Sequence, residues 1–174
     1  MFRRLKQRMA DAATLAALCR SAEAHARQDA QPEPGAEHFL LAALDLPEGS
    51  ARRAFARVGA DPDAVKPAIA LQYDEALHRI GLDPVGLAST PEPLVAPATG
   101  LYSAAPSGRE LVQGLAKGHR IDRRGPLLGA HVVEAVAATP HGVAARALRV
   151  MGVDMEMLRL AAKAETEGAQ AAAA

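Results

Sequence analysis

Apolar residues recur every three or four positions through most of this chain, and Gly or Pro separates the periodic stretches. In Thr14–Gln28, for example, Leu15, Leu18, Ala22 and Ala26 fall on one face of a helix. No stretch shows the sustained alternation that is typical of strands. The same pattern predicts further helices at 37–46, 50–58, 107–118 and 130–138. The sequence therefore predicts an all-α protein.

A second regularity appears when the chain is compared with itself. Gly35–Ile69 aligns with Leu128–Ala162 without a gap, at an offset of 93 residues (131 − 38). An ordered set of residues is shared by the two segments: His38 and His131, Pro47 and Pro140, Gly49 and Gly142, Gly59 and Gly152, Asp61 and Asp154. Such ordered identities indicate an internal duplication, with four helices in each copy.

The markers of each copy also predict where its helices end and begin. Gly59 and Gly152 follow an apolar stripe at the point where a helix commonly stops in a left-handed conformation. Asp61 and Asp154 then stand where a carboxylate can cap the next helix. Pro67 lies inside that next helix and removes a backbone donor, so a kink or an early end is expected there.

This parsing divides the chain into four segments. The first repeat covers residues 1–71 and the second covers 104–164. Residues 72–103 form an insert and linker, in which the Gly-Leu-Asp-Pro signal at 81–84 predicts a short extra helical element before a Pro-, Ser- and Thr-rich stretch. Residues 165–174 are expected to be a flexible tail.

Composition narrows the function classes. Lys plus Arg and Asp plus Glu balance at 20 each, which disfavours nucleic acid as a partner. No apolar run approaches the roughly 20 residues that span a bilayer, so no membrane partner is predicted. The single Cys19 excludes an intramolecular disulfide and favours a reducing compartment, the cytoplasm.

Catalytic and metal chemistry find no support in the sequence. It lacks the G-x-x-x-x-G-K-[ST] loop that cradles nucleotide phosphates, and it lacks a nucleophile signature. The six histidines are scattered rather than paired at zinc-ligand spacing. His38 and His131 are interpreted as helix-start residues that fix the preceding loop by a hydrogen bond, and Cys19 as a buried structural thiol. We therefore predict no catalytic residue, no metal and no cofactor.

Several phrases of the sequence resemble a known family. Gly35–Leu44 (GAEHFLLAAL) is similar to the Gly-Thr-Glu-His signature of Clp N-terminal repeats, and Glu48–Arg52 is similar to the phrase that follows it. His141–Arg146 and Gly152–Asp154 resemble the corresponding phrases of a second repeat. The resemblance, which covers most of residues 12–162, is to stand-alone members without a motor. It implies two pseudo-twofold-related four-helix repeats packed as one domain.

The resemblance also implies a candidate binding residue. In the ClpC branch of the family, a glutamate at the start of each repeat's second helix lines a pocket for phosphorylated arginine. Here that position is Glu37 in the first repeat but Ala130 in the second. One weak site is therefore expected, and Ala130→Glu is expected to strengthen binding if the second pocket is otherwise intact. The family's second-repeat aromatic and threonine fall on Ala104 and Ala105.

The function that the resemblance implies is that of a non-catalytic module linked to Clp-type ATP-dependent proteolysis. It would act as an adaptor or regulator that binds substrate segments, other adaptors or a Clp motor, including arginine-phosphorylated proteins. One alternative is a sponge for cyclic peptide antibiotics that target the motor, which the missing aromatic at Ala104 disfavours. A second alternative is a helical regulator that binds nucleic acid, which the zero net charge disfavours.

Overall fold

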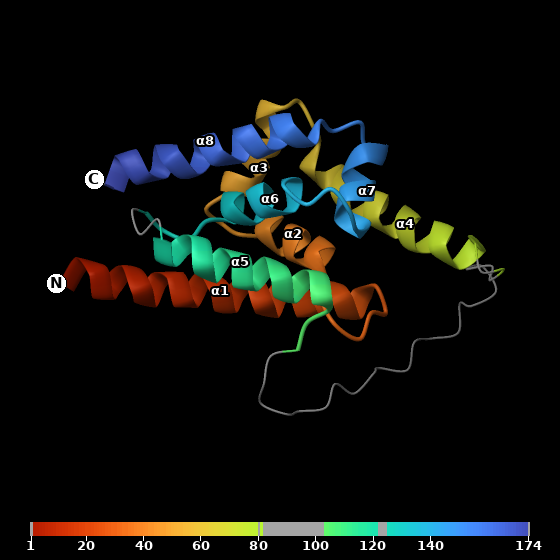
Figure 1. Ribbon diagram of the computed structural model, residues 1–174, viewed down its shortest axis with the longest axis horizontal. Coiled ribbons are helices and arrows are strands. Elements are labelled where there is room, and N and C mark those ends of the chain that lie inside the picture. The colour runs from red at the N-terminus through yellow and green to blue at the C-terminus, as the bar shows by residue number, and fades with distance from the viewer. Residues whose placement is uncertain (1, 80, 82–102, 122–124, 174) are drawn as a thin grey trace.

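The computed structural model describes residues 2–79, 81, 103–121 and 125–173 (Figure 1). Every regular element in these ranges is a helix, and no strand occurs among them. The prediction of an all-α protein is therefore confirmed. The predicted element at 81–84 and most of the predicted linker lie outside the described residues.

The described helices fall into two sets along the chain. The first set is α1 (Phe2–Gln28), α2 (Ala36–Leu44), α3 (Ser50–Arg57), the 3₁₀ turn η1 (Pro62–Ala64) and α4 (Val65–Arg79). The second set is α5 (Pro106–Ile121), α6 (Gly129–Ala137), α7 (Val143–Val150) and α8 (Met155–Ala173). The bounds of α6 and α7 equal those of α2 and α3 shifted by the 93-residue offset of the sequence alignment. The internal duplication stays a prediction, and these shared bounds support it.

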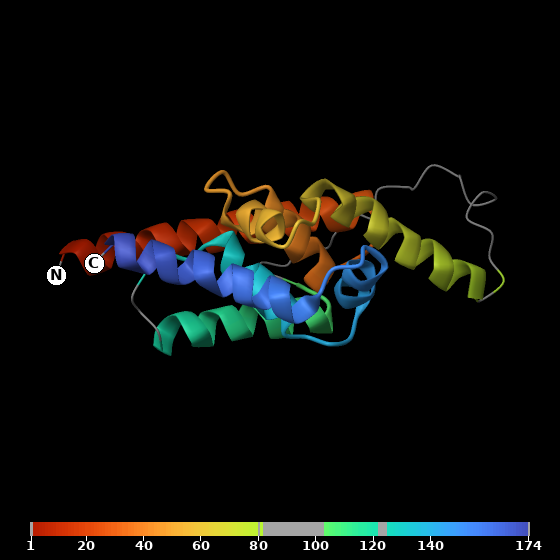
Figure 2. The same cartoon turned by 90° about the horizontal axis from the view of Figure 1, so that it is seen from above.

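Helices of the two sets pack on one another rather than only among themselves. α1 packs on α2, α5 packs on α6, and α2 and α6 pack together in the middle of the molecule. α3 lies against α8, while α7 lies against α4 (Figures 1 and 2). The last helix of each set is therefore held by the third helix of the other set, and neither set could bury its apolar face alone.

One shared core results from this exchange. Its largest fully buried side chains include Leu18, Phe39 and Phe55 from the first set and Leu148 and Leu158 from the second. Burying a side chain of this size contributes about 1.5–3 kcal/mol, so both sets depend on the same core for stability. The start of α1 and the end of α8 lie at the same end of the molecule in both views (Figures 1 and 2).

Local geometry at the predicted helix boundaries recurs in both sets. Gly59 and Gly152 have φ values of 68° and 72°, the left-handed conformation that ends α3 and α7. The Asp61 carboxylate accepts a hydrogen bond from the Asp63 N–H, and the Asp154 carboxylate accepts from the second and third N–H groups after it. These markers therefore serve as helix stops and starts.

The expected kink at Pro67 is absent. α4 begins at Val65, after the separate turn η1, so Pro67 lies in the first turn of the α-helix. The N–H groups of a first turn have no partner inside the helix, so the missing N–H of proline costs nothing there. α1 also begins earlier than predicted, at Phe2 rather than near Thr14.

The predicted boundary at 71/72 lies inside α4 rather than between segments. Gln72 is buried at 5% exposure, and its Oε1 accepts a hydrogen bond from Arg146 Nε of α7 at 3.1 Å. The first set therefore continues to Arg79. Its last turns carry Tyr73, which belongs to the candidate site described below.

The segment 165–174, predicted to be a flexible tail, falls on the last turns of α8 as far as residue 173. α8 continues to Ala173, and Glu165 on it is buried between two arginines of α3. Glu165 accepts from Arg53 Nε at 2.7 Å and from Arg57 Nε at 2.6 Å. Burial raises the pKa of the Glu165 carboxyl, but the hydrogen bonds and charges of the two arginines outweigh burial and leave this pKa below its ordinary value.

Candidate functional site

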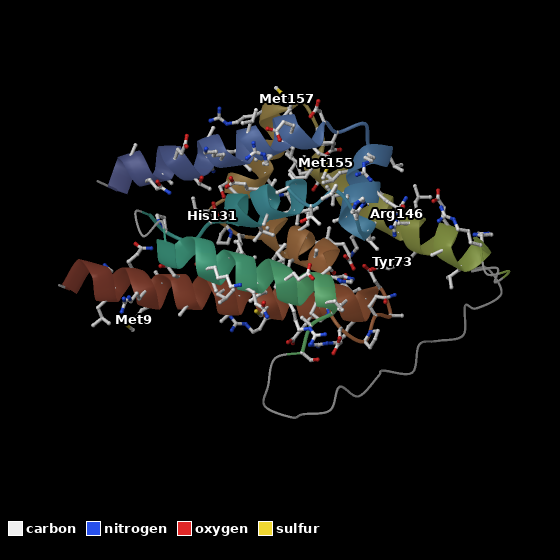
Figure 3. The ribbon with its side chains drawn as sticks, in the orientation of Figure 1. Met9, Tyr73, His131, Arg146, Met155 and Met157 are labelled. Atoms are coloured by element: carbon white, nitrogen blue, oxygen red, sulfur yellow. The ribbon has the colours of Figure 1, made fainter. Side chains whose placement is uncertain are left out.

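The starts of α2 and α6 share one local design. His38 Nδ1 accepts a hydrogen bond from the Gly35 N–H at 2.9 Å, and His131 Nδ1 accepts from the Leu128 N–H at 3.0 Å. Each ring therefore fixes the loop that precedes its helix. His38 is fully buried and its Nε2 lies 3.4 Å from Asp29 Oδ2, whereas His131 is half-buried (Figure 3).

We expect His38→Ala and His131→Ala each to lower the stability of the fold. Losing the hydrogen bond costs about 1 kcal/mol, and the cavity left by the fully buried His38 adds to that cost, so His38→Ala should be the more damaging. The measurement is thermal unfolding of both variants, with the exposed His78→Ala as control. A weaker metal affinity without any change in melting would contradict this structural role.

Glu37 stands in the first turn of α2 with only 7% of its surface exposed. Its Oε1 accepts a hydrogen bond from the Tyr73 hydroxyl of α4 at 2.8 Å. Burial, and after it the negative charge of Glu37, raise the pKa of Tyr73 well above its ordinary value, so this hydroxyl stays a donor. A Cβ at Gly35 would lie 2.4 Å from the same carboxylate oxygen, so glycine leaves room for the Glu37 side chain.

A groove of about 240 Å³ opens beside Glu37, between α2, α5, α6 and α7. Its lining includes the polar residues Glu37, Ser107, Glu110 and His141 and the apolar residues Leu111 and Val136. Ser107 Oγ accepts a hydrogen bond from the Ala36 N–H at 3.2 Å and so joins α5 to the start of α2. The groove is smaller than the roughly 300–1,000 Å³ of small-molecule sites, so it suits a single side chain better than a cofactor.

The charge of this groove favours a cation. Two carboxylates line it, Glu37 and Glu110, and no lysine or arginine does so among the residues that the structure describes. A carboxylate held in partly dry surroundings can take a guanidinium by a charge-assisted hydrogen bond. Sequence analysis identified Glu37 but missed Ser107, Glu110 and His141, because they come from α5 and from the loop between α6 and α7 and share no motif with Glu37.

The second-repeat counterpart of Glu37 has a different setting. Ala130 is fully buried, and its N–H donates to Ser50 Oγ at 2.9 Å. Ala104, where the family has an aromatic, is 1% exposed and offers no surface to a ligand. The Ala105 N–H donates to the Pro34 carbonyl oxygen, which ties the start of α5 to the loop before α2.

A second, more open cavity of about 370 Å³ lies where α3 and α7 end. It is lined by both stop glycines, Gly59 and Gly152, and by Met157 of α8 (Figure 3). Gly49 and Gly142 have positive φ values of 70° and 102° and lead the chain into α3 and α7. These four glycines shape the backbone of the loops.

The described residues show neither a metal-binding cluster nor a membrane-spanning helix. Within the described ranges, no group of three or more His, Cys, Asp or Glu side chains could hold a metal ion. No described helix is long and apolar enough to cross a bilayer. Cys19 is half-buried against the core rather than fully buried.

The described helices share one core, with an acidic groove beside the start of α2. Residues 10–88 match the family model of the Clp repeat (R) N-terminal domain. Over this segment, which includes Glu37 and His38, the resemblance seen in the sequence is therefore confirmed. Domains of this family are non-catalytic modules that bind proteins. No curated protein matches the chain.

Proposed function

We propose that this protein is a non-catalytic adaptor or regulator of Clp-type ATP-dependent proteolysis, acting in the cytoplasm. Its groove at the start of α2 takes an arginine or phosphoarginine side chain of a partner protein, and Glu37 holds the guanidinium. Support comes from the match over residues 10–88 and from the acidic lining of the groove. The partner is a substrate segment, another adaptor or a Clp motor.

The single observation that carries this proposal is the state of Glu37. Its carboxylate is nearly buried, lines the groove, and is positioned by the Tyr73 hydroxyl. A carboxylate positioned in this way loses little side-chain entropy when a cation arrives. Ala104 is buried, so the aromatic surface that a cyclic-peptide sponge would need is missing at that position.

We expect isothermal titration to find one binding site for free phosphoarginine or for a peptide that bears arginine or phosphoarginine. Glu37→Gln should weaken binding by roughly 10–100-fold, because a hydrogen bond to a charged group contributes about 1.5–3 kcal/mol. Glu167→Gln is a matched control, since Glu167 is exposed on α8 and does not line the groove. Two equivalent sites, or unchanged affinity in Glu37→Gln, would refute the proposal.

A further inference from the structure

The 93-residue offset pairs the residues around the groove at the start of α2 with a second set of residues around the start of α6. Ala36 and Glu37 at the start of α2 correspond to Gly129 and Ala130 at the start of α6. Across the groove, His141 corresponds to Glu48. In the same way, Val143 corresponds to Ser50. The surroundings of the start of α2 and of the start of α6 can therefore be compared residue by residue.

At the start of α6, the position that corresponds to the groove is filled by two side chains of the protein, those of Glu48 and Ser50. The Gly129 N–H donates to Glu48 Oε1 at 2.6 Å, and the Ala130 N–H donates to Ser50 Oγ at 2.9 Å. Ser50 also donates from its own N–H to Glu48 Oε2 at 2.7 Å and from its hydroxyl to Glu48 Oε1 at 2.9 Å. Three donors therefore converge on the carboxylate of the half-buried Glu48, beside the fully buried Ser50. We refer to this filled position at the start of α6 as the closed place.

At α2 the corresponding side chains provide no such cap. His141 is exposed and Val143 has no polar group, and both line the open groove instead. The first N–H of α2 is taken by Ser107 Oγ, which comes from α5. The difference between the open and the closed place therefore lies at two positions, the first residue of α3 or α7 and the residue two positions before it.

We propose that the start of α6 is a carboxylate-binding site that the protein occupies with its own Glu48. Its ligand class is a small carboxylate, held by the N–H groups of Gly129 and Ser50 and by the Ser50 hydroxyl. As a consequence, the chain presents one open groove, at the start of α2 in the first set, and one closed place, at the start of α6 in the second set. Only this consequence rests on the proposed function, because the carboxylate site itself is independent of any arginine ligand.

The test is chemical rescue of Glu48→Ala by acetate, with sodium chloride at equal ionic strength as control. The variant leaves buried N–H donors without an acceptor, so its Tm should fall by roughly 4–10 °C. Acetate at about 0.1 M should restore a measurable part of that loss, because a ligand that binds only the folded state raises its stability. The wild type should not respond to acetate, and neither should Glu156→Ala, whose lost carboxylate pairs with Arg159 at the surface.

A second readout locates the acetate. In amide NMR spectra of Glu48→Ala, the signals of Gly129 and Ser50 should shift with acetate concentration, and the double variant Glu48→Ala/Ser50→Ala should lose most of that response. Glu48→Gln keeps a hydrogen-bond acceptor, so its Tm should lie between those of wild type and Glu48→Ala. It replaces Glu48→Ala in the test if that variant is too unstable to study. An unchanged Tm in Glu48→Ala, or equal rescue by chloride, would overturn the proposal. Failure of arginine peptides to bind would leave this result untouched.

Discussion

Ala130→Glu is expected to destabilise the protein by about 3 kcal/mol or more rather than to complete a second phosphoarginine pocket. Ala130 is fully buried, and its N–H already donates to Ser50. A glutamate there would bring a second carboxylate close to that of Glu48, which already accepts hydrogen bonds from Gly129 and Ser50. Burying an unpaired charge beside a like charge is among the most costly single substitutions.

Chemical denaturation of Ala130→Glu and Ala130→Gln separates charge from size. Both variants add almost the same volume, so the extra loss in Ala130→Glu reports the charge. The double variant Glu48→Ala/Ala130→Glu removes the facing carboxylate and should recover part of this extra loss, as a double-mutant cycle would measure. A stable Ala130→Glu protein with a second arginine site would show that the closed place at α6 opens readily.

Glu165→Lys is expected to cost about 2–3 kcal/mol, although the sequence alone places this residue in a flexible tail. The substitution breaks both hydrogen-bonded ion pairs to α3 and puts a third cation beside Arg53 and Arg57. Breaking a fully buried pair typically costs about 3–5 kcal/mol, and the loss is smaller here because the arginine side chains are each 57% exposed and can regain water. Glu167→Lys is the control, since its carboxylate is 63% exposed.

The same residue predicts a pH dependence. The pKa of Glu165 is lower in the folded state than its ordinary value of 4.5, so its contribution to stability is complete above that value. The contribution is lost as pH falls through the lower folded pKa, where the carboxylate takes up its proton. Urea unfolding of wild type and Glu165→Gln at pH 7, 5 and 3 should therefore show a difference that shrinks with acid. An equal difference at all three values would argue against the ion pairs.

The local elements of this fold follow from linear patterns in the sequence. The apolar stripes predicted α2, α3, α6 and α7, and Gly59 and Gly152 stop helices where the pattern predicted. These features depend on residues within a few positions of one another, so a linear pattern contains them. Glu37 was identified only through the family signature, since a carboxylate in a first helical turn is common for other reasons.

The pairing of these helices, in contrast, is visible only in the folded molecule. A periodic stripe shows which face of a helix is buried, but it does not show which helix covers that face. The packing of α8 on α3 therefore emerged only in three dimensions, together with the burial of Glu165 against two arginines more than 100 residues away. This pairing turned the predicted flexible tail into part of the fold.

Contacts between residues distant in sequence also explain why the start of α2 is open and the start of α6 is closed. Glu48 and Ser50 close the start of α6 across about 80 residues, whereas Ser107 and His141 shape an open groove at the start of α2. Self-comparison of the sequence matches position with position, but it does not show that the side chain of one segment fills the space of another. That filling depends on hydrogen bonds between donors and acceptors that come together only when both sets of helices share one core.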